Sequence, residues 1–156
     1  MIPIAIPDFG DLELHNLVTD YNGTLAVDGV VLSGVAKRLK ALANDITIHV
    51  VTADTDGLAR EQLAGLPVQL TIIPPDDQAN AKLHFIRALD VEKVVALGNG
   101  RNDRKGIAAA ALGIAVIQEE GGAADTIIYA DIIATSILDA LDLLANPNRI
   151  KATLRS

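Results

Sequence analysis

The sequence of 156 residues contains no cysteine, which excludes disulfides, thiolate metal sites and thiol nucleophiles. Aromatic residues make up only 3% of a chain that is 50% hydrophobic, so its core must be built from aliphatic side chains. The chain has no basic run and a net charge of −7, which argues against binding to nucleic acid and to anionic membranes. No apolar stretch approaches the length needed to span a bilayer.

The first residues, Met-Ile-Pro-Ile-Ala, lack a basic segment followed by a long apolar one. We therefore expect no signal peptide and a cytoplasmic location. The length suits one domain with a sizeable core. Because the sequence has no internal repeat and no linker, we predict a single domain over residues 1–156.

Short apolar runs that are typical of buried strands alternate with amphipathic segments that are typical of helices. Residues 2–7 and 12–19 flank a Pro-Asp-Phe-Gly-Asp turn, and they predict an N-terminal β-hairpin. Further strands are predicted at residues 46–51, 68–73, 94–97, 114–117 and 131–134. Alternation with short links predicts an α/β fold: a parallel, Rossmann-like sheet in three layers, with helices on both faces.

One predicted strand ends abruptly in Asp20, within the stretch Leu17–Leu25. The Asn22-Gly23 pair that follows is a strong turn signal. In open α/β sheets, acid, metal and phosphate sites commonly lie at this end of a strand. Asp before Asn-Gly is also an ordinary way to leave a strand, through side-chain hydrogen bonds to the backbone. The remaining motifs must decide between these two interpretations.

Two other predicted strands end in small, polar sequences, Thr52-Ala53-Asp54 and Gly98–Asp103. All three ends lie on one edge of a parallel sheet, so these residues are expected to converge on one crevice. A carboxylate can attack phosphorus or ligate Mg²⁺, and a hydroxyl with adjacent amides can hold phosphoryl oxygens. The amide groups next to the hydroxyl and the carboxylate are those of Ala53 and Gly23, and Lys82 is the candidate cation.

These segments resemble the four motifs of the haloacid dehalogenase superfamily. Asp20-Tyr-Asn-Gly-Thr24 is similar to Asp-Lys-Thr-Gly-Thr, Thr52-Ala-Asp54 to Thr-Gly-Asp, and Gly98-Asn-Gly-Arg-Asn-Asp103 to Gly-Asp-Gly-X-Asn-Asp, while Lys82 supplies the remaining motif. The likeness is strongest to the phosphorylation domain of P-type ATPases and its small soluble relatives. It runs from about residue 14 to about residue 140, in the same order and with similar spacing.

The resemblance implies a role for each matching position. Asp20 would be the nucleophile that forms an aspartyl-phosphate, and Thr52 would bind the transferring phosphoryl group. Lys82 would steady both, and Lys93 is the alternative because the alignment at this lysine needs a gap. The implied cofactor is Mg²⁺, and its ligands would be Asp20, the main-chain carbonyl of Asn22, Asn99 and Asp103.

Two residues depart from the pattern. Phosphatases of this superfamily usually carry Asp at the position of Asn22, as general acid and then base, whereas the ATPases carry Thr and keep a long-lived phosphoenzyme. An amide cannot exchange a proton at neutral pH, so the resemblance predicts slow hydrolysis of the intermediate. Asn99 replaces an Asp, which removes a negative charge from the metal site and should weaken Mg²⁺ binding.

The inserted cap domains of the family are missing as well, because the links after the first motif and after the second strand are short. An open crevice suits a macromolecular substrate or a cap lent by a partner subunit. Together with the apolar composition, it favours a homodimer. The sequence does not identify the phosphorylated substrate.

Other interpretations compete with an enzyme. The two Asn substitutions are also consistent with a degenerate module that binds a phosphorylated ligand or protein partner. A receiver-like domain would need paired acidic residues at the end of the first strand, and Leu17-Val18-Thr19 offers none. The loop at Gly98 lacks the third glycine of a dinucleotide fingerprint. His49 is expected in the core, and Asp54 and Asp56 are expected as helix caps.

Overall fold

The computed structural model describes residues 1–55 and 57–156. Within this part of the chain, six strands form one parallel sheet: β3 (Asn16–Thr19), β6 (Thr47–Thr52), β7 (Gln69–Ile72), β8 (Val94–Gly98), β9 (Leu112–Val116) and β10 (Ile132–Ala134). Their order across the sheet is β10-β9-β8-β3-β6-β7, and every neighbouring pair is parallel. The strand that was predicted to carry Asp20, β3, therefore lies in the interior of the sheet.

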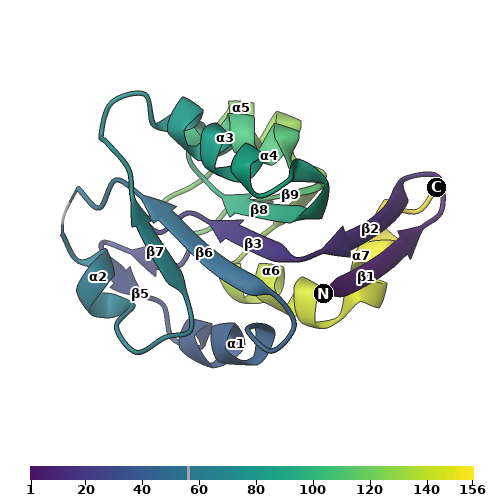
Figure 1. The fold of residues 1–156 in the computed structure, drawn as a ribbon, viewed down its shortest axis with the longest axis horizontal. Coiled ribbons are helices and arrows are strands. Elements are labelled where there is room, and N and C mark those ends of the chain that lie inside the picture. The colour runs from purple at the N-terminus through teal and green to yellow at the C-terminus, as the bar shows by residue number, and fades with distance from the viewer. Residues whose placement is uncertain (56) are drawn as a thin grey trace.

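The helices lie on both faces of the sheet, as the alternation of elements predicted (Figure 1). One face carries α3 (Gln78–Ala88), α4 (Arg104–Ala109) and α5 (Ala124–Tyr129). The other carries α1 (Val35–Leu42), α2 (Ala59–Gln62), α6 (Ile137–Ala145) and α7 (Pro147–Leu154). Two short 3₁₀ helices, η1 (Val91–Lys93) and η2 (Arg101–Asp103), flank β8. The predicted three-layer α/β fold is confirmed.

The two faces bury different amounts of apolar surface. The larger cluster joins the sheet to α1 and α6 through residues such as Leu17, Leu39 and Leu141, all fully buried. The smaller cluster, on the side of α3 and α4, includes Val18 and Ile86. Strand residues are apolar toward both faces, as expected for a parallel sheet that is covered on both sides.

The N-terminal hairpin is confirmed and continues directly into the central strand. β1 (Ile2–Ile6) pairs antiparallel with β2 (Gly10–Leu14), and the chain then runs through His15 into β3. The apolar side of the hairpin belongs to the larger core cluster, and α7 packs against β1. A second, smaller hairpin, β4 (Ala26–Val27) with β5 (Val30–Val31), follows the loop after Asp20.

Two further expectations concern single side chains, the buried histidine and the helix caps. His49 is buried in β6, where Nε2 lies 3.0 Å from Asn16 Oδ1 and the ring packs edge-on to Phe85. Burial lowers the pKa of His49, as expected of a core histidine. Asp54 Oδ1 accepts a hydrogen bond from the first amide of α2, on Ala59, whereas Asp56 lies outside the described residues.

Among the described helices, none combines the length and the apolar character needed to cross a membrane.

Candidate active site

Asp20 directly follows the last residue of β3, at the edge where its neighbours β6 and β8 also end. Its amide donates to Leu97 O at 3.0 Å, which fixes the backbone against β8. The side chain is 8% exposed. Asp20 Oδ1 accepts a hydrogen bond from Lys82 Nζ at 2.8 Å, and Oδ2 has no hydrogen-bond partner among the described residues. One carboxylate oxygen is thus held in place while the other remains available to a ligand.

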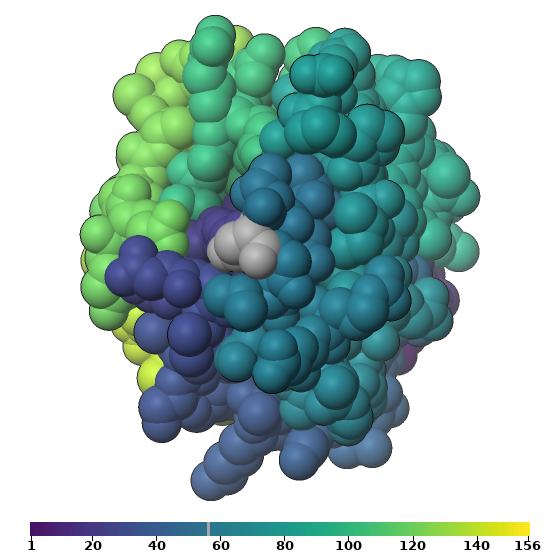
Figure 2. All heavy atoms as spheres, turned by 90° about the vertical axis from the view of Figure 1, so that its left-hand side faces the viewer, coloured from purple at the N-terminus to yellow at the C-terminus, as the bar shows by residue number. Residues whose placement is uncertain are grey.

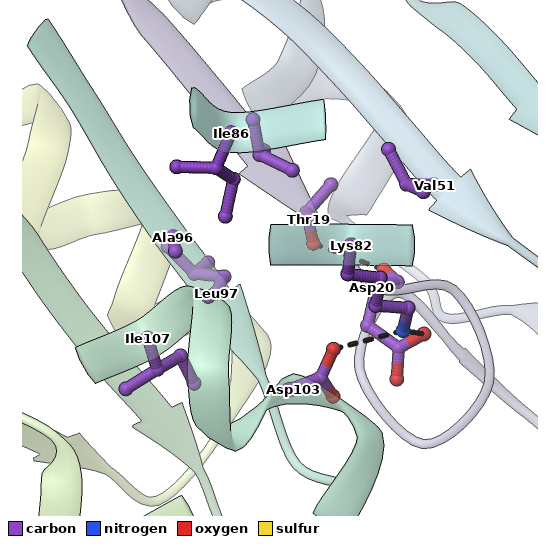
Figure 3. Close-up of a pocket in the computed structure, with 11 residues that line it drawn as sticks. Thr19, Asp20, Val51, Lys82, Ile86, Ala96, Leu97, Asp103 and Ile107 are labelled. Carbon is purple, nitrogen blue, oxygen red and sulfur yellow. Dashed lines mark hydrogen bonds and ion pairs between the residues drawn. The ribbon is translucent and has the colours of Figure 1, made fainter. Parts of the chain in front are cut away.

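Lys82 reaches this carboxylate from α3, on the face of the sheet that bears the smaller core. Its ammonium lies 2.8 Å from Asp20 Oδ1 and 2.8 Å from Asp103 Oδ1, so it bridges the two acids (Figure 3). The alternative lysine, Lys93, is exposed at the opposite end of the sheet, where its carbonyl accepts from His15 N. Of the two candidate lysines, the fold therefore brings Lys82 to the aspartates.

The side chain of Lys82 is almost completely shielded from solvent. Its side chain is 5% exposed, and the cavity lined by Asp20, Lys82 and Asp103 has a volume of about 10 Å³, hardly room for one water. Burial alone lowers the pKa of Lys82, but the negative charges of Asp103 and Asp20 outweigh this effect and raise it overall. The lysine therefore stays protonated.

Asp103 is the second acid of the cluster. Its Oδ1 accepts from Lys82 and its Oδ2 accepts from Gly100 N at 3.0 Å, so both oxygens are bonded. Burial raises the pKa of Asp103 to about 7, and the charge of Asp20 adds to this shift while Lys82 opposes it. Two buried carboxylates share one ammonium, which leaves an excess of negative charge that a bound cation would neutralise.

Lys82→Met is expected to lower the free energy of unfolding by about 3–5 kcal/mol at pH 7–8, because it leaves two buried carboxylates without their cation. Chemical denaturation at several pH values measures the loss. The raised pKa of Asp103 means that the folded protein holds this proton more tightly than the unfolded chain does. Ionisation of Asp103 therefore destabilises the folded protein more and more as the pH rises from about 4 to about 7. The decrease in the free energy of unfolding caused by Lys82→Met should accordingly be smaller in acid.

Lys93→Met is the matched control, since this lysine is exposed and makes no side-chain ion pair among those described; its effect should stay within about 0.5 kcal/mol. Adding Asp103→Asn to Lys82→Met should restore part of the lost stability by removing one unpaired charge. A Lys82→Met protein as stable as the wild type at pH 8 would contradict the prediction.

Thr52 ends β6, the neighbour of β3, and it is 4% exposed. Its Oγ1 accepts a hydrogen bond from Asp54 N at 3.1 Å, so the hydroxyl proton remains free to be donated. Thr52, Ala53 and Asp20 line one surface crevice of about 310 Å³ at the carboxyl ends of the strands. The fold thus brings the predicted nucleophile and the predicted phosphoryl-binding group into one hollow.

The Asn at position 99 is bonded on both sides within the protein. Its Nδ2 donates to Gly121 O at 3.1 Å, and its Oδ1 accepts from Thr24 Oγ1 at 3.3 Å. A carbonyl partner requires a donor, and an Asp at this position would supply none at neutral pH. Asn99 packs against Gly23, where an added Cβ would lie only 2.3 Å from Asn99 Nδ2. The amide therefore joins the loop after β3 to the loop after β9.

Oxygen ligands of the kind that Mg²⁺ prefers are present at the crevice. The predicted ligands Asp20, Asn22 and Asn99 line the crevice, and Asp103 lines the adjoining cavity together with Asp20. Among residues 1–55 and 57–156 there is no group of three or more His, Cys, Asp or Glu side chains that could hold a metal. This set fits Mg²⁺, which commonly binds through one or two carboxylates and keeps several waters.

Several residues of this region were not predicted from the sequence. Gln118 follows β9, donates through Nε2 to Thr24 O at 2.7 Å and Gly23 O at 3.2 Å, and accepts through Oε1 from Ile137 N at 2.9 Å. It thus clamps the loop after Asp20 to the start of α6. Thr55, Gln78 and Glu120 also line the crevice without having been predicted, whereas Asp54 and Asn102 come from the predicted strand ends. The sequence could have indicated Gln118 and Glu120 through the position of their loop, because the loop after β9 also leaves the carboxyl edge of the sheet.

Comparison with known proteins finds similarity both in sequence and in structure. No family model matches the chain. The chain is 48% identical over 79 residues to the uncharacterized protein MJ0073 of Methanocaldococcus jannaschii, and the match covers 48% of this chain and 85% of that protein.

Similar solved structures include the 3-deoxy-D-manno-octulosonate 8-phosphate phosphatase of Moraxella catarrhalis in complex with magnesium, phosphate and a KDO molecule. Its TM-score is 0.70 at 18% sequence identity, and the match covers 91% of this chain and 94% of that chain. Also similar is a putative hydrolase of the haloacid dehalogenase superfamily from Legionella pneumophila, with a TM-score of 0.72 and 17% identity over 90% of this chain and 87% of that chain. The cobalt-bound octulosonate phosphatase of Haemophilus influenzae has a TM-score of 0.71 and 15% identity over 92% of this chain and 90% of that chain. The chain thus belongs to the family of the Methanocaldococcus jannaschii protein, and its fold is that of the haloacid dehalogenase superfamily hydrolases.

Proposed function

We propose that the chain is a Mg²⁺-dependent phosphohydrolase that acts through an aspartyl-phosphate on Asp20. The observation that carries this proposal is the setting of that carboxylate: Lys82 holds its Oδ1, and Asp20 lines a crevice that Thr52 also lines. Solved structures with this fold include phosphatases bound to magnesium and to phosphate.

In the first step, Asp20 Oδ2 attacks phosphorus, and the bond between phosphorus and the oxygen of the leaving group breaks. Thr52 Oγ1 donates to a phosphoryl oxygen, and the ammonium of Lys82 balances the charge that builds up around Asp20. Mg²⁺ bound by Asp20 and the Asn22 carbonyl, beside Asn99 and Asp103, would neutralise phosphoryl oxygens. In the second step, water attacks phosphorus and the carboxylate of Asp20 leaves.

Neither step receives a proton from residue 22, because an amide is neither an acid nor a base at neutral pH. A leaving group that departs without a proton should therefore react best. Acetyl phosphate, which releases acetate, is the sharpest probe, and 4-nitrophenyl phosphate is the next. The second step should be slow, and covalent phosphate should accumulate.

The test is to incubate the purified protein with acetyl phosphate and Mg²⁺. Phosphate release is followed by a colorimetric assay, and covalent phosphate by mass spectrometry of an acid-quenched sample. We expect slow release, a protein mass increased by one phosphoryl group, and the loss of both signals in EDTA. The proposal would be overturned if the protein acquired no covalent phosphate and released no phosphate above the protein-free blank.

A degenerate module that binds a phosphorylated ligand is the second candidate. Two observations favour it: Asn22 has replaced the usual acid, and the amide of Asn99 is already bonded to Gly121 and Thr24. Calorimetric titration with inorganic phosphate and Mg²⁺ distinguishes the two. Saturable binding without turnover of acetyl phosphate would support the module.

A further inference from the structure

The crevice above Asp20 is small and is lined by amides and acids. Its volume of about 310 Å³ is at the lower end of the range for small-molecule sites. Figure 2 shows the face of the molecule on which the segment near residue 120 (light green) and the segments after β6 (blue to teal) lie. Residues from both segments line the crevice. Around Asp20 and Thr52 lie the amides of Asn22, Gln78 and Asn102. These dimensions suit a short-chain ester with hydroxyl groups.

Cations are scarce around this opening. None of the described residues that line the crevice is a lysine or an arginine. Lys82 lies below Asp20 and is already shared by two carboxylates. The neighbouring Arg101 is exposed, and its Nε lies 3.1 Å from Asp125 Oδ2. A second anionic group on a substrate would therefore find no positive charge to pair with there.

Two carboxylates also line the rim. Glu120 is exposed, and its Oε2 accepts from Asp28 N at 3.3 Å, which holds the acid at the mouth of the crevice. Asp54 also lines the crevice, and its Oδ1 accepts from Ala59 N at 2.9 Å. The bound metal of the proposed mechanism would balance the phosphoryl group, whereas the leaving group would meet these two acids.

We infer that the part of the bound substrate outside its phosphoryl group is small and neutral or cationic, and that Glu120 and Asp54 reject substrates that carry a carboxylate there. This inference rests on the proposed function and specifies its substrate class. Like charges about 6 Å apart at an effective dielectric constant of about 40 repel enough to weaken binding about tenfold.

The experiment compares two esters with the same carbon skeleton, glycerol 3-phosphate and 3-phosphoglycerate, which differ by a carboxylate. Each is tested as a competitor of acetyl phosphate hydrolysis at saturating Mg²⁺, because competition measures occupancy whatever the rate at which the ester is cleaved. We expect 3-phosphoglycerate to inhibit about tenfold more weakly, and phosphoethanolamine to inhibit at least as well as glycerol 3-phosphate. The difference should shrink at high salt, since Glu120 is exposed.

Glu120→Gln keeps the acceptor for Asp28 N and removes the charge, so it should reduce the tenfold difference to about threefold, with Asp54 responsible for the rest. Glu119→Gln is the matched control, because Glu119 is exposed but does not line the crevice; it should leave the ratio unchanged. Equal inhibition by the two esters, or a ratio that Glu120→Gln does not alter, would overturn this inference alone. No hydrolysis of acetyl phosphate at all would overturn the proposed function and the inference with it.

Discussion

Asp20→Asn is expected to abolish both the covalent phosphate and the hydrolysis of acetyl phosphate, down to the protein-free blank. An amide oxygen is a far weaker nucleophile than a carboxylate, so residue 20 should no longer attack phosphorus. The fold should survive, because Asn has nearly the same shape and Lys82 keeps its partner Asp103 at 2.8 Å. Phosphate release and the mass of the acid-quenched protein, measured beside the wild type, test this expectation.

Asp45→Asn is a matched control, because it makes the same chemical change at an exposed site far from the crevice, and its activity should equal that of the wild type. Thermal unfolding of both variants checks that the loss is not caused by unfolding. If Asp20→Asn still acquires a phosphoryl group at the rate of the wild type, the nucleophile lies elsewhere.

Asn22→Asp is expected to raise the rate of phosphate release about 10²–10⁴-fold, the usual contribution of a positioned proton donor and acceptor. Residue 22 lines the same crevice as Asp20 and Thr52. A carboxyl group there could protonate the leaving oxygen and then deprotonate the attacking water. The covalent phosphate should correspondingly decay faster, and rapid-quench measurements with acetyl phosphate and 4-nitrophenyl phosphate follow both steps.

Asn22→Ala separates proton transfer from a change in the shape of the crevice, and it should give no acceleration. The gain in Asn22→Asp should also depend on pH, because the new carboxyl group must change its protonation state during the reaction. Should Asn22→Asp bind phosphate and Mg²⁺ but release no product, the binding module becomes the better account of this site.

Much of the architecture could be predicted because it depends on local patterns. Aliphatic runs predicted the strands of the sheet, and the turn at Asn22-Gly23 correctly indicated that a strand ends next to Asp20, since β3 ends at Thr19. The identity of the site lysine was harder to predict, because neither spacing nor composition distinguishes Lys82 from Lys93. Only the packing of α3 over the sheet turns Lys82 toward Asp20, while Lys93 remains at the other end.

The contacts of Gln118 and Glu120 could not be predicted for a related reason. Both residues lie in a polar loop that has no apolar periodicity, and their partners are distant in sequence: Gln118 bonds to Thr24, and Glu120 bonds to Asp28. Which loops meet depends on the order of strands across the sheet, and a single sequence gives no direct signal of that order. The hydrogen bonds of Asn99 could not be predicted for the same reason, although the sequence does show that Asn99 replaces the Asp of the motif.

The interior position of β3 bears on how the molecule comes into being. This strand is among the first that a ribosome makes, yet its two neighbours are β6 and β8, and β8 is translated much later. Until that distant partner emerges, the unfinished sheet exposes an apolar edge, and Lys82 and Asp103 have no fixed places beside Asp20. Such long-range pairing slows folding and leaves nascent chains open to aggregation. Reactivity at Asp20 should therefore appear late and all at once, when the growing chain has passed Asp103.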